Sequence, residues 1–106
     1  MSCNPLEQTI PFRLSSFELF SPDDHGLYSF WFRKTCIYVG KAEDSSIKKR
    51  LTDHWTRTHN DYLRYWIDAK GPKLRIKTKI INNKKDIEIF ERFYIRKFRP
   101  LANKTS

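Results

Sequence analysis

Two strand-forming runs separated by only two residues constrain this chain more than any other feature of its sequence. Residues 27–32 (LYSFWF) and 35–39 (TCIYV) are rich in aromatic and β-branched side chains, which favour extended backbone. Arg33 and Lys34 lie between the runs, so we expect the two strands to pair as a tight hairpin. Each run carries a tyrosine close to a glycine, which strand propensity does not explain.

Hydrophobic periodicity predicts three helices and one more strand after this hairpin. Apolar residues recur at helical spacing over 46–58, 61–70 and 85–98. Residues 74–81 alternate between apolar and polar side chains, as in a half-buried strand. The side chains expected to face the core are Tyr62, Leu63, Trp66 and Ala69 from the second helix, and Leu74, Ile76, Thr78 and Ile80 from the strand.

The segment before the hairpin, residues 1–25, is predicted to form an N-terminal arm. It is rich in proline and turn residues, with one short extended piece expected over 17–20. Residues 26–106 then form a single domain. Its order of strand, strand, helix, helix, strand, helix indicates an α+β fold, in which helices flank a small three-stranded antiparallel sheet.

Composition narrows the class of partner. The chain has 106 residues with 21 Lys and Arg against 12 Asp and Glu, and its net charge of +9 favours a polyanion such as nucleic acid. We see no export signal and no apolar run long enough to span a membrane, so we expect a cytoplasmic or nucleoid-associated protein with no membrane partner. The two cysteines, Cys3 and Cys36, exclude a disulfide framework.

Glu91 is the residue that packing explains least. On the helix over 85–98, Ile87 and Tyr94 belong to an apolar stripe, and Glu91 lies four residues after the first and three before the second. Burial of a carboxylate without a partner costs several kcal/mol, so a cation or a dense set of hydrogen-bond donors must meet it. Two readings stay open: an ion pair with an arginine, or a ligand of a hard divalent cation such as magnesium.

Arg50 and His54 lie one helical turn apart, beside the apolar stripe of the first predicted helix. A partly shielded arginine followed by a histidine suits phosphate recognition and proton transfer. The alternative is that Arg50 is a solvated arginine and His54 a surface histidine. Taken by itself, each residue is more often found in that role.

Together these residues resemble the GIY-YIG nuclease superfamily. The matching elements, in order, are GLY ending at Tyr28, YVG beginning at Tyr38, Arg50 with His54, Glu91, and the trailing Asn103. The string YVGK followed by KKR is similar to the nuclease domain of the incision subunit of bacterial nucleotide excision repair. The resemblance spans about residues 26–103. The interval from Gly40 to Arg50 is longer than in the repair enzyme, and Arg57 is the alternative arginine.

The resemblance implies a DNA endonuclease with one divalent ion, Mg²⁺ or Mn²⁺. It implies that Glu91 holds the metal and that Arg50 binds the scissile phosphate and stabilises its charge in the transition state. Tyr28 and Tyr38 would position and deprotonate the attacking water, with Tyr28 as the proton acceptor. A free phenol is a poor base at neutral pH, so a neighbouring group has to assist it.

Three further residues receive supporting roles. Lys41, like His54 and the metal, is a candidate for lowering the pKa of a phenol, and Lys41 is alternatively a phosphate contact. Asn103 is expected to order the closing loop or the site. His59 is a weaker candidate for the site, and its simpler role is that of a capping or solvated side chain.

A basic surface is expected to bind DNA. Its candidate residues are Lys41, Lys48, Lys49, Arg57, Arg75, Lys77 and Lys79. A homodimer or a partner protein would supply target specificity. One alternative function is a nucleic-acid-binding module that keeps this fold and has no activity. A weaker alternative is a zinc site formed by Cys36, His54 and His59, whose spacing fits no common zinc motif.

Overall fold

An antiparallel sheet of four strands forms the centre of the protein, which we describe from a computed structural model over residues 8–103. The strands are β1 (Gln8–Pro11), β2 (Gly26–Phe32), β3 (Thr35–Ala42) and β4 (Arg75–Ile80), in the order β1-β4-β2-β3. The helices are α1 (Leu14–Phe17), α2 (Ile47–Thr56), α3 (Asp61–Lys70) and α4 (Lys84–Phe98), with 3-10 turns η1 (Gly71–Lys73) and η2 (Leu101–Asn103). The predicted helices and the last strand are confirmed within two residues at each end.

The predicted hairpin is also confirmed. β2 pairs with β3 from Gly26↔Ala42 to Phe32↔Thr35, and Arg33 adopts a left-handed φ of 56° in the turn between them. Gly26 begins β2 with a φ of 145°, and a Cβ there would lie 2.0 Å from the backbone oxygen of Lys79. Only glycine therefore fits where the hairpin meets β4.

The expectation of three strands is wrong, because the fourth strand comes from the segment predicted as an arm. β1 pairs antiparallel with β4, and the extended piece expected over 17–20 is replaced by the end of the short helix α1 and a turn. Phe12 and Phe17 are buried against the sheet and α2. This segment thus contributes Ile10, Phe12, Phe17 and Phe20 to the core, while the proposed boundary at residue 25 stays a prediction.

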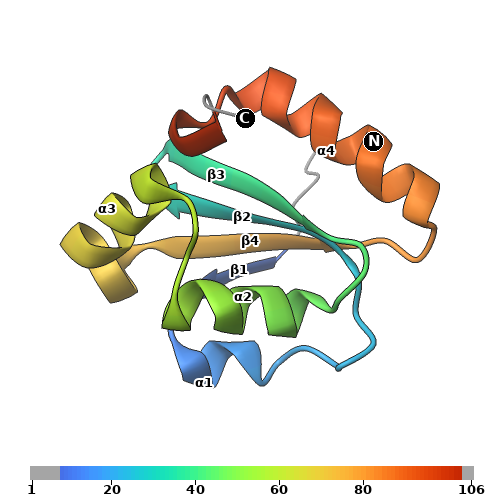
Figure 1. Ribbon diagram of the computed structural model, residues 1–106, viewed down its shortest axis with the longest axis horizontal. Helices are drawn as coiled ribbons and strands as arrows, with labels where there is room; N and C mark the ends of the chain where they lie inside the picture. The colour runs from blue at the N-terminus through green and yellow to red at the C-terminus, as the bar shows by residue number, and fades with distance from the viewer. Residues whose placement is uncertain (1–7, 104–106) are drawn as a thin grey trace.

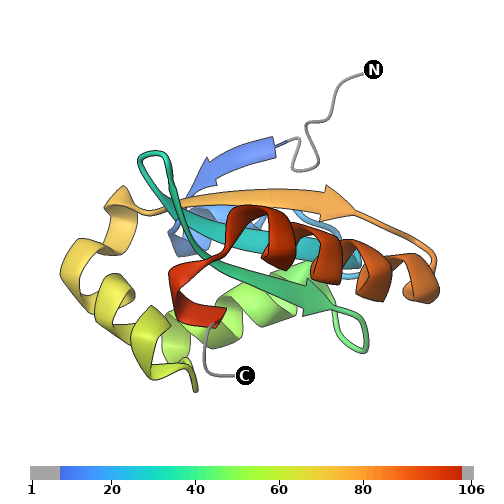
Figure 2. The same cartoon turned by 90° about the horizontal axis from the view of Figure 1, so that it is seen from above.

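The helices cover the two faces of the sheet unequally (Figures 1 and 2). α1 and α2 lie on one face, over a core that includes Tyr28, Phe30 and Leu51. α4 crosses the other face over β2 and β3, where its residues Ile87 and Tyr94 pack in a second core. α3 lies at the end of the sheet where β4 begins (Figure 1). The edge of β3 thus lies between α2 and α4. No helix within residues 8–103 is long and apolar enough to cross a membrane.

Local signals explain where the helices begin. The side chains of Ser46, Asn60 and Asn83 accept hydrogen bonds from backbone N–H groups in the first turns of α2, α3 and α4. Some expected core positions are exposed: Tyr62 and Ala69 on α3 and Ile80 at the end of β4 face solvent. α3 instead packs through Leu63, Trp66 and Ile67, so its apolar arc is narrower than its sequence suggests.

Candidate active site

A cleft of about 510 Å³ opens beside the C-terminal half of α2. Its walls come from β3, α2 and the segment that joins α2 to α3. They comprise Tyr38, Arg50, Asp53, His54, Thr56, Arg57, Thr58, His59 and Asn60. Arg50 also lines a smaller hollow of about 90 Å³, together with Lys41 and Glu43. The Arg50 guanidinium therefore connects the two hollows.

Tyr28 and His54 form a hydrogen-bonded pair behind this cleft. The Tyr28 hydroxyl lies 2.8 Å from Nε2 of His54, because β2 and α2 pack face to face. Tyr28 is fully buried, and burial raises its pKa far above the ordinary value of a phenol. The nearby Tyr38 raises this pKa further, whereas the positive charge of Arg50 opposes the shift. The phenol is therefore neutral at physiological pH.

Thr58 is the second hydrogen-bond partner of His54. Nδ1 of His54 lies 3.0 Å from Oγ1 of Thr58, an oxygen that also accepts the backbone N–H of Asn60. When Nδ1–H donates to Thr58, Nε2 accepts the hydrogen bond from Tyr28. Burial lowers the pKa of His54 to about 4, and the charge of Arg50 adds to this effect. A neutral imidazole thus faces the Tyr28 hydroxyl at neutral pH.

Acidification should destabilise the protein through His54. The folded pKa of about 4 lies below the ordinary value of 6.5, so the unfolded state binds the proton more readily. Stability is then lost as the pH falls from about 6.5 to about 4, by up to about 3 kcal/mol. In urea unfolding, His54→Gln should flatten this pH dependence, whereas His59→Gln at an exposed position should retain it. An unchanged slope in His54→Gln would contradict the buried neutral imidazole.

Gly40 allows the ring of Tyr28 to lie across β3. The two residues are paired in the hairpin, and a Cβ at position 40 would lie 2.4 Å from Cζ and 2.5 Å from the hydroxyl oxygen of Tyr28. Gly40 of the YVG motif is thus required to make room for Tyr28 of the GLY motif.

Gly40→Ala should displace the Tyr28 ring and break its hydrogen bond to His54. Overpacking of this kind costs about 1–3 kcal/mol, measurable by urea unfolding. The pKa of His54, followed by NMR, should rise toward its ordinary value. Gly71→Ala is the control for the His54 pKa only: its φ of 46° makes an alanine strained, but nothing lies within 4 Å of the added Cβ, so the His54 pKa should stay unchanged. A Gly40→Ala protein with wild-type stability and an unshifted His54 would exclude this packing.

Tyr38 stands between the buried pair and the cleft. Its ring centroid lies 6.2 Å from that of Tyr28 and 5.6 Å from that of His54. Tyr38 is half-buried and its pKa is raised mainly by burial, while Arg50 lowers it and Glu91 raises it. Both charged groups therefore act on the same phenol, although they come from α2 and α4.

Glu91 reaches this site from α4. Its side chain is 20% exposed and lies 4.0 Å from Nζ of Lys41, which is 3.6 Å from Glu43. Burial raises the pKa of Glu91, and Lys41 is the main group that lowers it. Within residues 8–103 no arginine forms an ion pair with Glu91, and 4.0 Å is too long for a direct hydrogen bond from Lys41. The carboxylate is thus only loosely neutralised.

Lys41 also links the site to Arg50 through its backbone. Its carbonyl oxygen accepts a hydrogen bond from Nε of Arg50 at 3.3 Å. Arg50 is exposed at the surface of both hollows. This bond orients the guanidinium toward the end of β3.

Asn103 fastens the C-terminal turn η2 to the edge of β3. Its side chain accepts the N–H of Val39 at 2.9 Å and donates to the Val39 carbonyl at 3.0 Å, in the manner of a neighbouring strand. Asn60 holds the same turn by donating to the carbonyl of Ala102 at 2.7 Å. Because Val39 follows Tyr38, Asn103 supports a residue of the cleft without lining it.

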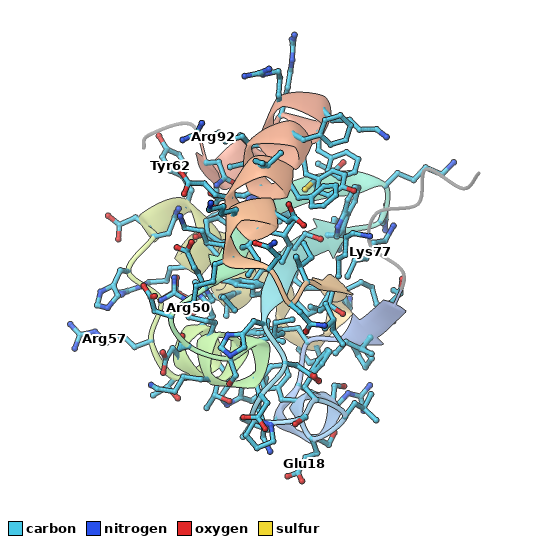
Figure 3. The ribbon with its side chains drawn as sticks, turned by 90° about the vertical axis from the view of Figure 1, so that its right-hand side faces the viewer. Glu18, Arg50, Arg57, Tyr62, Lys77 and Arg92 are labelled. Carbon is cyan, nitrogen blue, oxygen red and sulfur yellow. The ribbon has the colours of Figure 1, made fainter. Side chains whose placement is uncertain are left out.

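The expected DNA-binding residues are divided between two faces. Arg57 lines the cleft, while Lys48 and Lys49 lie on the outer side of α2. Lys77 and Lys79 lie on the opposite face, with Nζ 4.3 Å from the centre of the Trp31 ring and 5.5 Å from that of Phe90. Arg75 shares that side of β4. Figure 3 shows Lys77 on the other side of the sheet from Arg50 and Arg57.

The zinc alternative is wrong for the described residues. Cys36 is buried in the core under α4, whereas His54 lies on the α2 face of the sheet. No group of three or more His, Cys, Asp or Glu side chains within residues 8–103 is arranged to hold a metal ion.

Thr58 and Gly40 are the structural contributors that sequence reasoning missed. Thr58 follows His54 by four residues but lies beyond the end of α2, after Arg57 in an extended conformation, so helical spacing does not explain their contact. Gly40 was part of a recognised motif, but its role depends on the cross-strand register with Tyr28. Neither relation was available from the spacing of the residues in the sequence.

Comparison with known proteins identifies this arrangement. A model of the GIY-YIG catalytic domain matches residues 24–105. The chain belongs to the GIY-YIG family. The magnesium-bound GIY-YIG N-terminal endonuclease domain of UvrC from Thermotoga maritima superposes with a TM-score of 0.66 and 26% identity, over 85% of this chain and 94% of that chain. A tyrosine-to-phenylalanine mutant of that domain, bound to its catalytic divalent cation, also gives a TM-score of 0.66 and 26% identity. That match covers 85% of this chain and 93% of the mutant domain. Curated protein sequences gave no match.

The GIY-YIG match begins at residue 24, after β1 and α1. Both GIY-YIG motif tyrosines, Tyr28 and Tyr38, lie within it on adjacent strands. β1 and α1 therefore lie outside the region that the family model matches, whereas the structural match to the UvrC domain covers 85% of this chain.

Proposed function

We propose that this GIY-YIG chain is a Mg²⁺- or Mn²⁺-dependent endonuclease that hydrolyses DNA phosphodiester bonds by activated-water attack. One observation supports the proposal most: the hydrogen-bonded Tyr28 and His54 lie beside Arg50 and the loosely neutralised Glu91. A domain that only binds nucleic acid does not need these groups to be brought together. The similar UvrC domains bind a catalytic divalent cation, which adds support for a metal at Glu91.

The residues around Glu91 fit one hard cation. Magnesium accepts a single carboxylate when waters and substrate oxygens complete its shell. A cation would offset the charge that burial penalises in Glu91, whose pKa is already raised. The metal, when bound, supplies positive charge that stabilises a phosphoryl oxygen in the transition state.

Arg50 is proposed to bind the scissile phosphate. A guanidinium donates paired hydrogen bonds to phosphate oxygens, and Arg50 is exposed on both hollows while its Nε is held by the Lys41 carbonyl. Lys41 contributes a second positive charge between Glu43 and Glu91. Phosphate binding at this point brings the reacting bond to the mouth of the cleft beside Tyr38.

Tyr28 is proposed to accept the proton of the attacking water and to pass its own proton to His54. This transfer avoids a free phenolate, which the raised pKa of Tyr28 makes unfavourable. His54 takes the proton in the tautomer that carries its hydrogen on Nδ1, whose free Nε2 lies 2.8 Å from the Tyr28 hydroxyl. Since Tyr28 has no exposed surface, the water must enter between Tyr38 and Arg50, so substrate binding has to shift one of these side chains.

DNA is proposed to approach along α2. Arg57 lines the cleft, and Lys48 projects from the same helix. Lys49 is already paired with Asp53 at 3.0 Å, which reduces its contribution. Target specificity is assigned to a homodimer or to a partner protein.

Arg50→Ala separates the enzyme from the alternative, an inactive binding module. Its cleavage of a labelled duplex in Mg²⁺ should fall by about 10²–10³-fold, as for loss of one transition-state donor. Arg96→Ala, at an exposed position of α4, should cleave like the wild type. If the wild type binds DNA but never cleaves it, the inactive module is correct.

A further inference from the structure

An exposed aromatic surface adjoins the cleft, and nothing in the proposed reaction uses it. Asp61, Tyr62, Tyr65, Trp66 and Leu101 line a hollow of about 550 Å³ between α3 and η2. Tyr62 is 54% and Tyr65 67% exposed, although aromatic side chains usually contribute to cores. The volume falls in the range of about 300–1,000 Å³ that is typical of sites for small ligands.

This hollow is continuous with the candidate active site. An intermediate hollow is lined by His59, Asn60, Asp61 and Tyr62. It shares His59 and Asn60 with the cleft, and it shares Asp61 and Tyr62 with the aromatic hollow. A strand whose phosphate lies at Arg50 can therefore continue along these walls to α3. Tyr62 lies on the same side of the molecule as Arg50 and Arg57 in Figure 3.

The walls of the hollow are held in place. Asn60 caps α3 by accepting the N–H of Leu63 at 3.0 Å, and its amide donates to the carbonyl of Ala102 in η2 at 2.7 Å. Tyr65 and Trp66 contact each other edge to face, with ring centroids 6.0 Å apart. Tyr62 and Tyr65 are three positions apart on α3 and so lie on one side of the helix.

The chemistry of the hollow fits a nucleobase and not a phosphate. Its apolar aromatic walls offer stacking surfaces, which every base can use. Asp61 would repel a phosphate, but its carboxylate can accept a hydrogen bond from the amino group of a base. Bases in a continuous duplex are already stacked and paired, so only an unpaired base can enter.

We propose that the Tyr62–Tyr65 hollow binds an unpaired base of the substrate strand, so that the enzyme prefers DNA with a single-stranded segment beside the cleavage site. This inference rests on the proposed nuclease function, because the strand is placed by its phosphate at Arg50. A protein partner that buries the same aromatic side chains is the competing occupant.

The test measures binding in EDTA, where no cleavage takes place. One labelled duplex is compared with the same duplex carrying an unpaired flap, by fluorescence anisotropy, with 2-aminopurine in the flap as a stacking reporter. The double variant Tyr62→Ala with Tyr65→Ala is expected to lose roughly 5- to 150-fold in affinity for the flap DNA for each base stacked. Its affinity for the duplex should stay within about twofold, because stacking on α3 needs an unpaired base. The 2-aminopurine should be quenched by the wild type and not by the variant.

The matched control is Ile89→Ala with Phe93→Ala, two exposed apolar residues on the outer side of α4. It should bind both DNAs as the wild type does. Equal affinity of the wild type for flap and duplex, or an equal loss in the control, would overturn the inference and favour a protein partner at α3. Cleavage of plain duplex is scored separately, so a nuclease without flap preference refutes the hollow alone. A protein that never cleaves refutes the proposed function.

Discussion

Glu91→Gln should lose nearly all metal-dependent cleavage and still bind DNA in EDTA. Glutamine keeps the size of the side chain but lacks the charge that a hard cation requires. Metal stabilisation of the transition state is worth several kcal/mol, and each ~1.4 kcal/mol is a factor of ten, so we expect a loss of at least about 10³-fold. Plasmid nicking across a Mg²⁺ titration measures the loss, and isothermal titration calorimetry with Mg²⁺ and Mn²⁺ measures binding directly.

Glu88→Gln is the matched control for this change. Glu88 lies on the same helix and pairs with Arg92 at 2.7 Å on the solvent side. It should retain wild-type activity and metal binding. In EDTA, Glu91→Gln should be at least as stable as the wild type, because burial raises the pKa of Glu91 and so disfavours its ionised form. A strongly destabilised Glu91→Gln protein with intact cleavage would indicate a structural ion pair in place of a metal ligand.

Tyr28→Phe should lose about 10²–10⁴-fold in cleavage, the usual contribution of general acid–base catalysis. The change removes the hydroxyl that is hydrogen-bonded to His54 at 2.8 Å and keeps the ring. It leaves Nε2 of a largely buried His54 without its partner, at a cost of about 1–3 kcal/mol in stability. Single-turnover cleavage and urea unfolding measure the two effects.

Tyr38→Phe is the comparison that assigns the proton acceptor. Tyr38 lines the cleft and does not form the bond to His54, so its variant should be nearly as stable as the wild type and lose less activity than Tyr28→Phe. The pH dependence of cleavage should change in Tyr28→Phe and be retained in Tyr38→Phe. The reverse order of losses would assign the proton acceptance to Tyr38.

Local sequence pattern was sufficient to predict the hairpin, the helices and the side of α4 on which Glu91 lies. Helical phase alone places Glu91 beside the stripe of Ile87 and Tyr94, and the structure has it half-buried on that side of α4. The hairpin followed from two strand-forming runs around Arg33 and Lys34. These features depend on residues close in sequence, which is why a single sequence contains them.

Features that depend on packing between distant segments were not predictable. β1 is four residues long and ends at Pro11, so only its pairing with β4 identifies it as a strand. The bond between Tyr28 and His54 joins residues 26 positions apart and requires the packing of α2 on the sheet. The alternation of apolar and polar residues along β4 correctly placed Lys77 on the face opposite Leu74 and Ile76. It carried no information about which helix covers each face of the sheet.

The most direct measurement is the conversion of supercoiled plasmid by the purified wild-type protein in Mg²⁺, with EDTA and Glu91→Gln in parallel. The proposed nuclease predicts nicked or linear plasmid in Mg²⁺ and intact supercoiled plasmid in both parallel reactions. Plasmid that stays supercoiled in both Mg²⁺ and Mn²⁺, with protein that binds it, would contradict the nuclease function. Equal cleavage by Glu91→Gln would contradict the metal site at Glu91.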